Sequence, residues 1–270
     1  MGDDPVEHRP GTLVDLTLLI AEELPCYWAT HMPFQHKTFN YFADRPDQAA
    51  PLLRRTGPYQ TRWMLIDEHT GTHVDAPAHF VPPPGTGLPH EGDAGRVTVD
   101  LLPLEQLCGP AVVIDVPEDL PGAAPGVSPI IGPGLIEDFE RAHGEIRPGE
   151  VVLFRGRWDR HYAPGDAGAA YCAAPLVTRT GPGWPAPEPP AMELLLDRGV
   201  RCVGTDSPSM GSSHDGGPVH VTGLSAGACY VEALTNLGAL PTRGAWFQFA
   251  PLRLARGTGA PGRAFAYLPA

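Results

Sequence analysis

Residues 69–79 read His-Thr-Gly-Thr-His-Val-Asp-Ala-Pro-Ala-His, and this segment carries most of the information about the fold and the chemistry. The chain has 11 histidines in 270 residues, so eleven positions should hold fewer than one, yet this segment holds three. The proline disfavours a helix interior. On an extended backbone alternate side chains share a face, and the polar residues all occupy odd positions: His69, His73, Asp75 and His79. The segment therefore predicts a strand that presents three imidazoles and a carboxylate on one side.

The spacing of these side chains favours a metal site. On an ideal strand His69 and His73 lie roughly 13 Å apart, too far to share one ion, so the chain should bend at Gly71. Two imidazoles and the Asp75 carboxylate suit Zn²⁺, Mn²⁺ or Fe²⁺, and three protein ligands leave a position for water. A bound ion lowers the pKa of that water to about 7. His79, beyond the proline, is placed to move protons to or from it.

Length and charge limit the remaining possibilities. A chain of 270 residues with 42% apolar and 19% charged residues predicts one domain over residues 1–270. The net charge of −12 disfavours nucleic acid and an anionic membrane surface as partners. Five cysteines without a Cys-x-x-Cys pair indicate a reducing cytoplasm. An acidic start over residues 1–5 and the lack of an 18-residue apolar stretch predict neither a signal peptide nor a membrane span.

The apolar pattern along the chain alternates between strands and helices. Strands are expected over residues 13–18, 59–66, 111–116, 151–154, 200–204, 245–250 and 263–268. Helices are expected over residues 133–142 and 190–198, each followed by a glycine. Loop excursions are expected near 31–58, as a cover for a site, and near 156–190, as a loop or lid. Strands that alternate with helices favour the α/β class.

Residues 69–80 closely resemble the signature of the metal-dependent cyclase/hydrolase family, which includes bacterial kynurenine formamidase, isatin hydrolase and cyclases of polyketide pathways. Other segments agree in order, namely residues 14–17, 109–115 and 204–209, followed by His220, Glu232 and Asn236-Leu237. The resemblance thus runs from about residue 12 to 250. It implies a compact swivelling β/β/α domain, and it implies assembly as a homodimer or homotetramer.

The resemblance also assigns roles to individual residues. It implies metal ligands at His69, His73 and Asp75, a more distant metal-binding pair at His220 and Glu232, and a catalytic histidine at His79. The cofactor it implies is a divalent metal, Zn or Mn, as one or two ions. A helix over residues 221–227 leading into a strand over 229–233 would suit the distant pair. The Trp-Pro-Gly-Asp motif of kynurenine formamidases is missing, which predicts a different substrate, and Trp28 is the nearest candidate for a substrate-binding residue.

These features predict an enzyme that cleaves a C–N bond of a small aromatic amide, formamide or lactam with metal-activated water and with His79 as proton shuttle. The alternative is a metal-dependent cyclase that closes a ring in polyketide or other antibiotic biosynthesis. A metal-holding protein without activity is disfavoured, because a structural site needs no extra base such as His79. A serine hydrolase built on Ser207 is also disfavoured, because no Gly-x-Ser-x-Gly motif is present.

Overall fold

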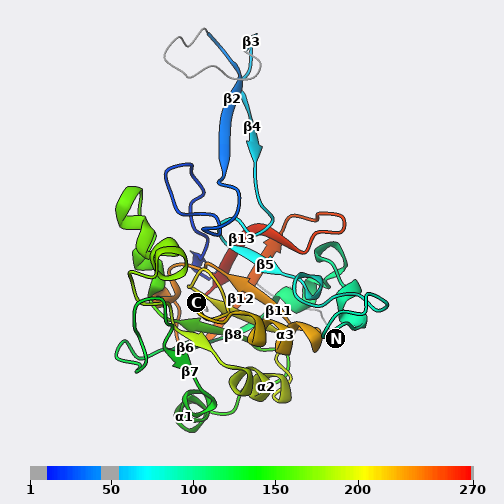
Figure 1. The fold of residues 1–270 in the computed structure, drawn as a ribbon, viewed down its shortest axis with the longest axis vertical. Coiled ribbons are helices and arrows are strands. Elements are labelled where there is room, and N and C mark those ends of the chain that lie inside the picture. The colour runs from blue at the N-terminus through cyan, green and yellow to red at the C-terminus, as the bar shows by residue number, and fades with distance from the viewer. Residues whose placement is uncertain (1–10, 44–54, 269–270) are drawn as a thin grey trace, which may run out of the picture.

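The chain folds around one large sheet with helices on its outer side (Figure 1). The structure, a computed structural model, describes residues 11–43 and 55–268. The α-helices are α1 (Pro133–His143), α2 (Pro189–Asp197) and α3 (Gly217–Ser225). The strands are β1 (Leu13–Asp15), β2 (Gln35–Tyr41), β3 (Arg55–Thr56), β4 (Thr61–Leu65), β5 (His73–Asp75), β6 (Cys108–Asp115), β7 (Ile130–Ile131), β8 (Val151–Arg155), β9 (Ala186–Pro187), β10 (Cys202–Thr205), β11 (Cys229–Glu232), β12 (Arg243–Pro251) and β13 (Gly259–Tyr267).

The main sheet closes on itself. Its order is β1-β13-β12-β6-β8-β10-β11-β5, and β5 also pairs with β13, so seven strands form a barrel with β1 added at one side. Strands β6, β8, β10 and β11 are parallel, whereas β5, β12 and β13 pair with their neighbours antiparallel. Full closure removes the exposed strand edges that an open sheet would present.

The alternation of side chains along each strand builds two cores. Val151 and Leu153 of β8 point into the barrel, whereas Val152 and Phe154 point outward against α1 and α2. Because both faces of these strands are buried, their sequences read as uninterrupted apolar runs. The α1 helix begins at a proline, where its missing N–H costs nothing, and it is followed by Gly144 at φ +86°.

The fold agrees with the predicted α/β class, and most predicted elements form within a few residues of the expected bounds. In place of the loop expected over residues 31–58, part of this range forms strand β2, which pairs with β4 in a projecting hairpin (Figure 1). The sequence missed β2 because polar and apolar residues do not alternate strictly there. The expected loop over 156–190 contains short helical turns at Trp158–His161, Gly165–Ala170 and Ala174–Thr178.

Helix α3 begins at Gly217, four residues before the predicted start, and therefore includes His220. Its first turn contains Gly217 and Pro218, which resemble a loop in sequence although proline is well suited to a helix start. Among the described helices, none is long and apolar enough to cross a membrane.

Candidate metal centre

The predicted site residues converge on the outer face of the barrel, where β5 pairs with β11. His73 and Asp75 point outward because Val74 between them lies in the barrel core. Glu232 of β11 stands directly opposite His73 in the register and points to the same side, since Val231 faces the core. The antiparallel pairing of two short strands thus brings the Glu232 carboxylate to His73 and Asp75, which lie about 160 residues earlier in the chain.

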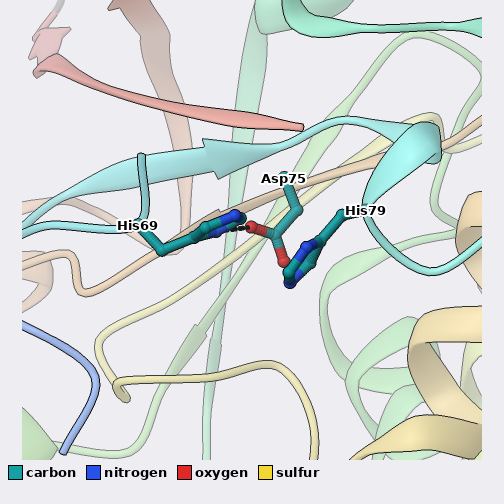
Figure 2. Close-up of side chains that lie close together, drawn as sticks. All are labelled: His69, Asp75 and His79. Carbon is teal, nitrogen blue, oxygen red and sulfur yellow. Dashed lines mark hydrogen bonds and ion pairs between the residues drawn. The ribbon is translucent and has the colours of Figure 1, made fainter. Parts of the chain in front are cut away.

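The two outer histidines of the segment reach this face through bends. Gly71 has φ +62°, which provides the bend expected between His69 and His73. The extended segment predicted on either side of this bend is shorter than expected, because only His73–Asp75 is a strand and Pro77–His79 is a 3-10 turn. This turn folds His79 back so that its ring stacks on His69 with centroids 4.0 Å apart. Figure 2 shows both rings beside the Asp75 carboxylate.

His220 approaches from helix α3. Its Nε2 lies 3.3 Å from Oε1 of Glu232 and 3.5 Å from Oδ2 of Asp75. Phe80, which the sequence did not suggest, stacks on the His220 ring with a centroid distance of 4.3 Å. The helix can come this close because residue 223 is glycine: a Cβ there would lie 1.9 Å from the Tyr230 hydroxyl, which itself hydrogen-bonds the backbone of α3.

Backbone carbonyls orient two of the imidazoles. Nδ1 of His73 lies 2.8 Å from the Gly71 carbonyl oxygen, and Nδ1 of His220 lies 2.6 Å from that of Gly216. A carbonyl can only accept, so Nδ1 carries the proton in both rings and donates it there. In the neutral rings Nε2 then has a free lone pair directed at the carboxylates. This is the tautomer that a metal-binding histidine adopts when a second partner holds its other nitrogen.

Burial and proximity shift the pKa values of the whole cluster. Burial by itself lowers the pKa of His73 and of His220, but the adjacent Asp75 and Glu232 raise both to about 10. Burial raises the pKa of each carboxyl, but the surrounding imidazoles outweigh it and hold both below their usual values. Burial lowers the pKa of His79 to about 4, so its ring is neutral at pH 7. Asp75 and Glu232 are both buried. Because a buried carboxylate is costly without a compensating charge, this pair requires positive charge beside it.

The side chains present fit a divalent cation. Oδ2 of Asp75 is fully buried and accepts no hydrogen bond from the described residues. Ligand atoms of two trios lie within 4.8 Å of one another, and Asp75 belongs to both: one trio adds His69 and His79, the other His73 and Glu232. Imidazole nitrogens and carboxylate oxygens are the usual ligands of Zn²⁺ and Mn²⁺. A cation would replace the protons that the imidazoles otherwise hold.

The cluster forms the floor of a cavity of about 180 Å³. Trp28, the predicted substrate-binding residue, lies in its wall and packs edge-on against the buried Trp184 with centroids 6.0 Å apart. Of the predicted excursion over 31–58, His31 alone among the described residues lines this cavity. Aromatic side chains that the sequence did not single out complete the wall: Tyr27, Phe80, Tyr162 and Tyr171. They come from four separate segments, which no local pattern connects.

A barrel that carries buried imidazoles and carboxylates at the floor of a cavity defines a candidate metalloenzyme. Residues 14–212 match the model of the putative cyclase family. The chain is 37% identical over 220 residues to isatin hydrolase of Roseibium aggregatum, covering 79% of this chain and 77% of that protein. It is 29% identical over 206 residues to kynurenine formamidase of Salinibacter ruber, covering 74% and 76%.

The solved structures agree with these relatives. A crystal structure of an isatin hydrolase bound to the product analogue thioisatinate superposes with a TM-score of 0.75 and 28% identity, over 96% of this chain and 92% of that one. The chain therefore belongs to the cyclase family. The predicted fold type and the prediction of an enzyme of the cyclase and hydrolase type are confirmed.

Proposed function

We propose that the protein hydrolyses the C–N bond of a small aromatic amide, formamide or lactam with a bound divalent metal, Zn²⁺ or Mn²⁺. The observation that carries this proposal is the buried cluster of imidazoles and carboxylates at the floor of a cavity with aromatic walls. The named relatives, an isatin hydrolase and a kynurenine formamidase, support the reaction class. The cytoplasm is the compartment we propose, since all five cysteines are unpaired thiols.

The residues that would hold the metal are His73, Asp75 and Glu232, together with His69 and His220. When bound, the metal supplies Lewis-acid chemistry: it polarises the substrate carbonyl and lowers the pKa of a water molecule. The protein orients two of the potential metal ligands before a metal binds, because backbone carbonyls accept the Nδ1–H groups of His73 and His220 and leave Nε2 directed at the carboxylates. Asp75 belongs to both trios of potential ligands, so these side chains would hold either one ion or two.

His79 is the group that moves the proton. Its ring lines the cavity and is partly exposed to it, whereas the other cluster residues of β5 and β11 are fully buried. No described residue forms a hydrogen bond with its nitrogens, so they are available to water and substrate. A neutral His79 accepts a proton from the attacking water and returns it to the nitrogen that leaves the carbonyl. His79 differs in this respect from His73 and His220, whose Nδ1–H groups are held by backbone carbonyls.

The cavity wall indicates the substrate class. Trp28, Tyr27, Tyr162 and Tyr171 present ring faces and edges, and about 180 Å³ is room for one or two fused rings. Burial raises the pKa values of Tyr162 and Tyr171 above the usual value for tyrosine, so both hydroxyls stay uncharged at neutral pH. A flat, uncharged or weakly charged aromatic amide suits such a wall better than a highly charged ligand.

A mass-resolved screen tests the proposal. Purified protein, loaded separately with Zn²⁺ and Mn²⁺, is incubated with isatin, aryl formamides, anilides and polyketide mimics. Hydrolysis adds the mass of one water to the substrate or splits it at the amide. The second candidate, ring closure, is favoured by the cyclase description of the matching family and would leave the mass unchanged or remove one water. Turnover of no amide by the fully metal-loaded enzyme would contradict the proposed hydrolysis.

A further inference from the structure

A turn over residues 28–31 presents two side chains to the cavity. The backbone N–H of His31 donates to the carbonyl oxygen of Trp28 at 2.8 Å, and the side chains of both residues line the cavity. The His31 side chain is 41% exposed, whereas the imidazoles and carboxylates of the cluster are almost entirely buried. His31 therefore stands at the open side of the cavity, where a molecule that enters can reach it.

Side-chain contacts fix both ends of this turn. The Trp28 ring packs edge-on against the buried Trp184. Nδ1 of His31 lies 3.3 Å from Oδ2 of Asp67, and Oδ1 of the same carboxylate accepts the backbone N–H of His69 at 2.8 Å. One carboxylate thus positions the His31 imidazole and also the start of the metal-binding segment. Groups that are held in place before binding lose less conformational freedom when a molecule binds.

Asp67 also determines which nitrogen of His31 is available. An ionised carboxylate can only accept hydrogen bonds, so it favours the ring form that has its proton on Nδ1. In the neutral ring Nε2 then has a free lone pair, which accepts a hydrogen bond from an N–H or O–H group. Other polar groups of the wall are already engaged, because the Tyr162 hydroxyl donates to a backbone carbonyl and Oγ of Ser209 accepts a backbone N–H. Nε2 of His31 is therefore an acceptor that the cavity offers to a bound molecule.

We propose that Nε2 of His31 accepts a hydrogen bond from an N–H or O–H group on the aromatic part of the substrate, away from the scissile carbonyl. This inference rests on the proposed amide hydrolysis, in which that carbonyl lies at the cavity floor. Apolar cavities commonly orient their ligands with a few placed polar groups of this kind. The preferred substrates are then aromatic amides with an amino or hydroxyl substituent. No lysine or arginine lines the cavity among the described residues, which disfavours an anionic substituent at the same place.

Three variants test the role of His31. His31→Phe keeps a flat ring but has no acceptor, and His31→Gln keeps an acceptor, the side-chain amide oxygen, without the ring. His143→Ala is the matched control, because His143 is exposed at the end of α1 and does not line the cavity. Circular dichroism, thermal melts and metal analysis check that each variant folds and binds metal like the wild-type protein.

The first measurement is binding, which needs no turnover. Aminoacetophenones with the amino group in the ortho, meta or para position are compared with the matching methylacetophenones, because a methyl group is similar in size to an amino group but donates no hydrogen bond. These ketones have no amide bond to cleave. In NMR titrations we expect the wild-type protein to bind at least one amino compound about 3–10-fold more tightly than its methyl counterpart. This preference should disappear in His31→Phe, persist in part in His31→Gln and remain complete in His143→Ala.

The second measurement uses the corresponding amino- and methylformanilides as substrates of the metal-loaded enzyme. A hydrogen bond that is equally strong in the bound substrate and in the transition state changes KM rather than kcat. His31→Phe should therefore raise KM for the amino substrate about 3–10-fold more than KM for the methyl substrate. Equal preference for the amino compounds in the wild-type protein and in His31→Phe, or no preference in the wild-type protein, would overturn the inference. Hydrolysis of no amide at all would contradict the proposed function alone, because the binding preference is measured with ketones.

Discussion

Replacement of His79 by alanine separates two chemical roles that the geometry permits for this residue. As a proton shuttle, His79 contributes to rate but not to metal binding. General acid–base catalysis contributes about 10²–10⁴-fold, which corresponds to about 3–5 kcal/mol of barrier. As a metal ligand, in the trio with His69 and Asp75, it would contribute to metal content instead. We assign the first role as part of the proposed function, because the His79 ring lines the cavity and is less buried than His73, Asp75 and Glu232.

The assay measures kcat and bound metal on the same protein preparation. We expect His79→Ala to retain its metal and to lose about 10²–10⁴-fold in kcat. His73→Ala is the matched comparison, because it should lose both metal and turnover by leaving the buried Asp75 and Glu232 carboxylates without their partner. Imidazole added to the solution should restore part of the activity of His79→Ala, since the missing ring leaves room in the cavity. It should restore none to His73→Ala.

Two results would refute this reasoning in different ways. If His79→Ala kept full kcat, the proton would travel by another route, and the assignment of the shuttle would be wrong. If His79→Ala lost its metal together with its activity, His79 would be a ligand of the ion, and the trio with His69 and Asp75 would be a true binding site. Metal content alone distinguishes these two outcomes.

Three further predictions concern stability and metal binding. Gly223→Ala should weaken metal binding at least tenfold in a titration of metal-free protein, because a Cβ placed 1.9 Å from the Tyr230 hydroxyl forces α3, and with it His220, away from the barrel; unchanged affinity would show that α3 does not set the site. Removal of the metal by a chelator should lower Tm by several degrees, and reloading should restore it, because the cation binds the folded state alone; an unaltered melt would count against a buried cation. Burial and the nearby Asp159 raise the pKa of Asp206 from 3.8 to about 7, so the folded protein holds a proton there that the unfolded chain releases. This contribution to the free energy of unfolding is complete below about pH 4 and disappears as the pH rises to about 7, by up to about 4 kcal/mol. Asp206→Asn should therefore lose less stability than the wild-type protein between pH 4 and pH 8 in denaturant titrations, and parallel curves would contradict this.

Local sequence patterns were sufficient for the strands of the barrel and for two of its helices. Strands β6 and β8 are apolar without interruption because both faces are buried, and this pattern needs no knowledge of their neighbours. Helices α1 and α2 begin at prolines and are closed by Gly144 and Gly199, whose positive φ angles require glycine. Strand β2 and the start of α3 were missed, because their residues have no distinctive period and their conformations depend on their partners.

The sequence by itself determined that three imidazoles and a carboxylate lie in one short segment. This clustering predicts a metal site, because burying such polar groups costs free energy unless a cation or other partner compensates them. Only the tertiary structure decided how they meet. Strand β11 places Glu232 opposite His73, and helix α3 places the His220 ring next to Asp75. The 3-10 turn places the His79 ring against His69. These contacts join residues far apart along the chain, so strand register and helix packing, which no local pattern encodes, set the distances on which the chemistry depends.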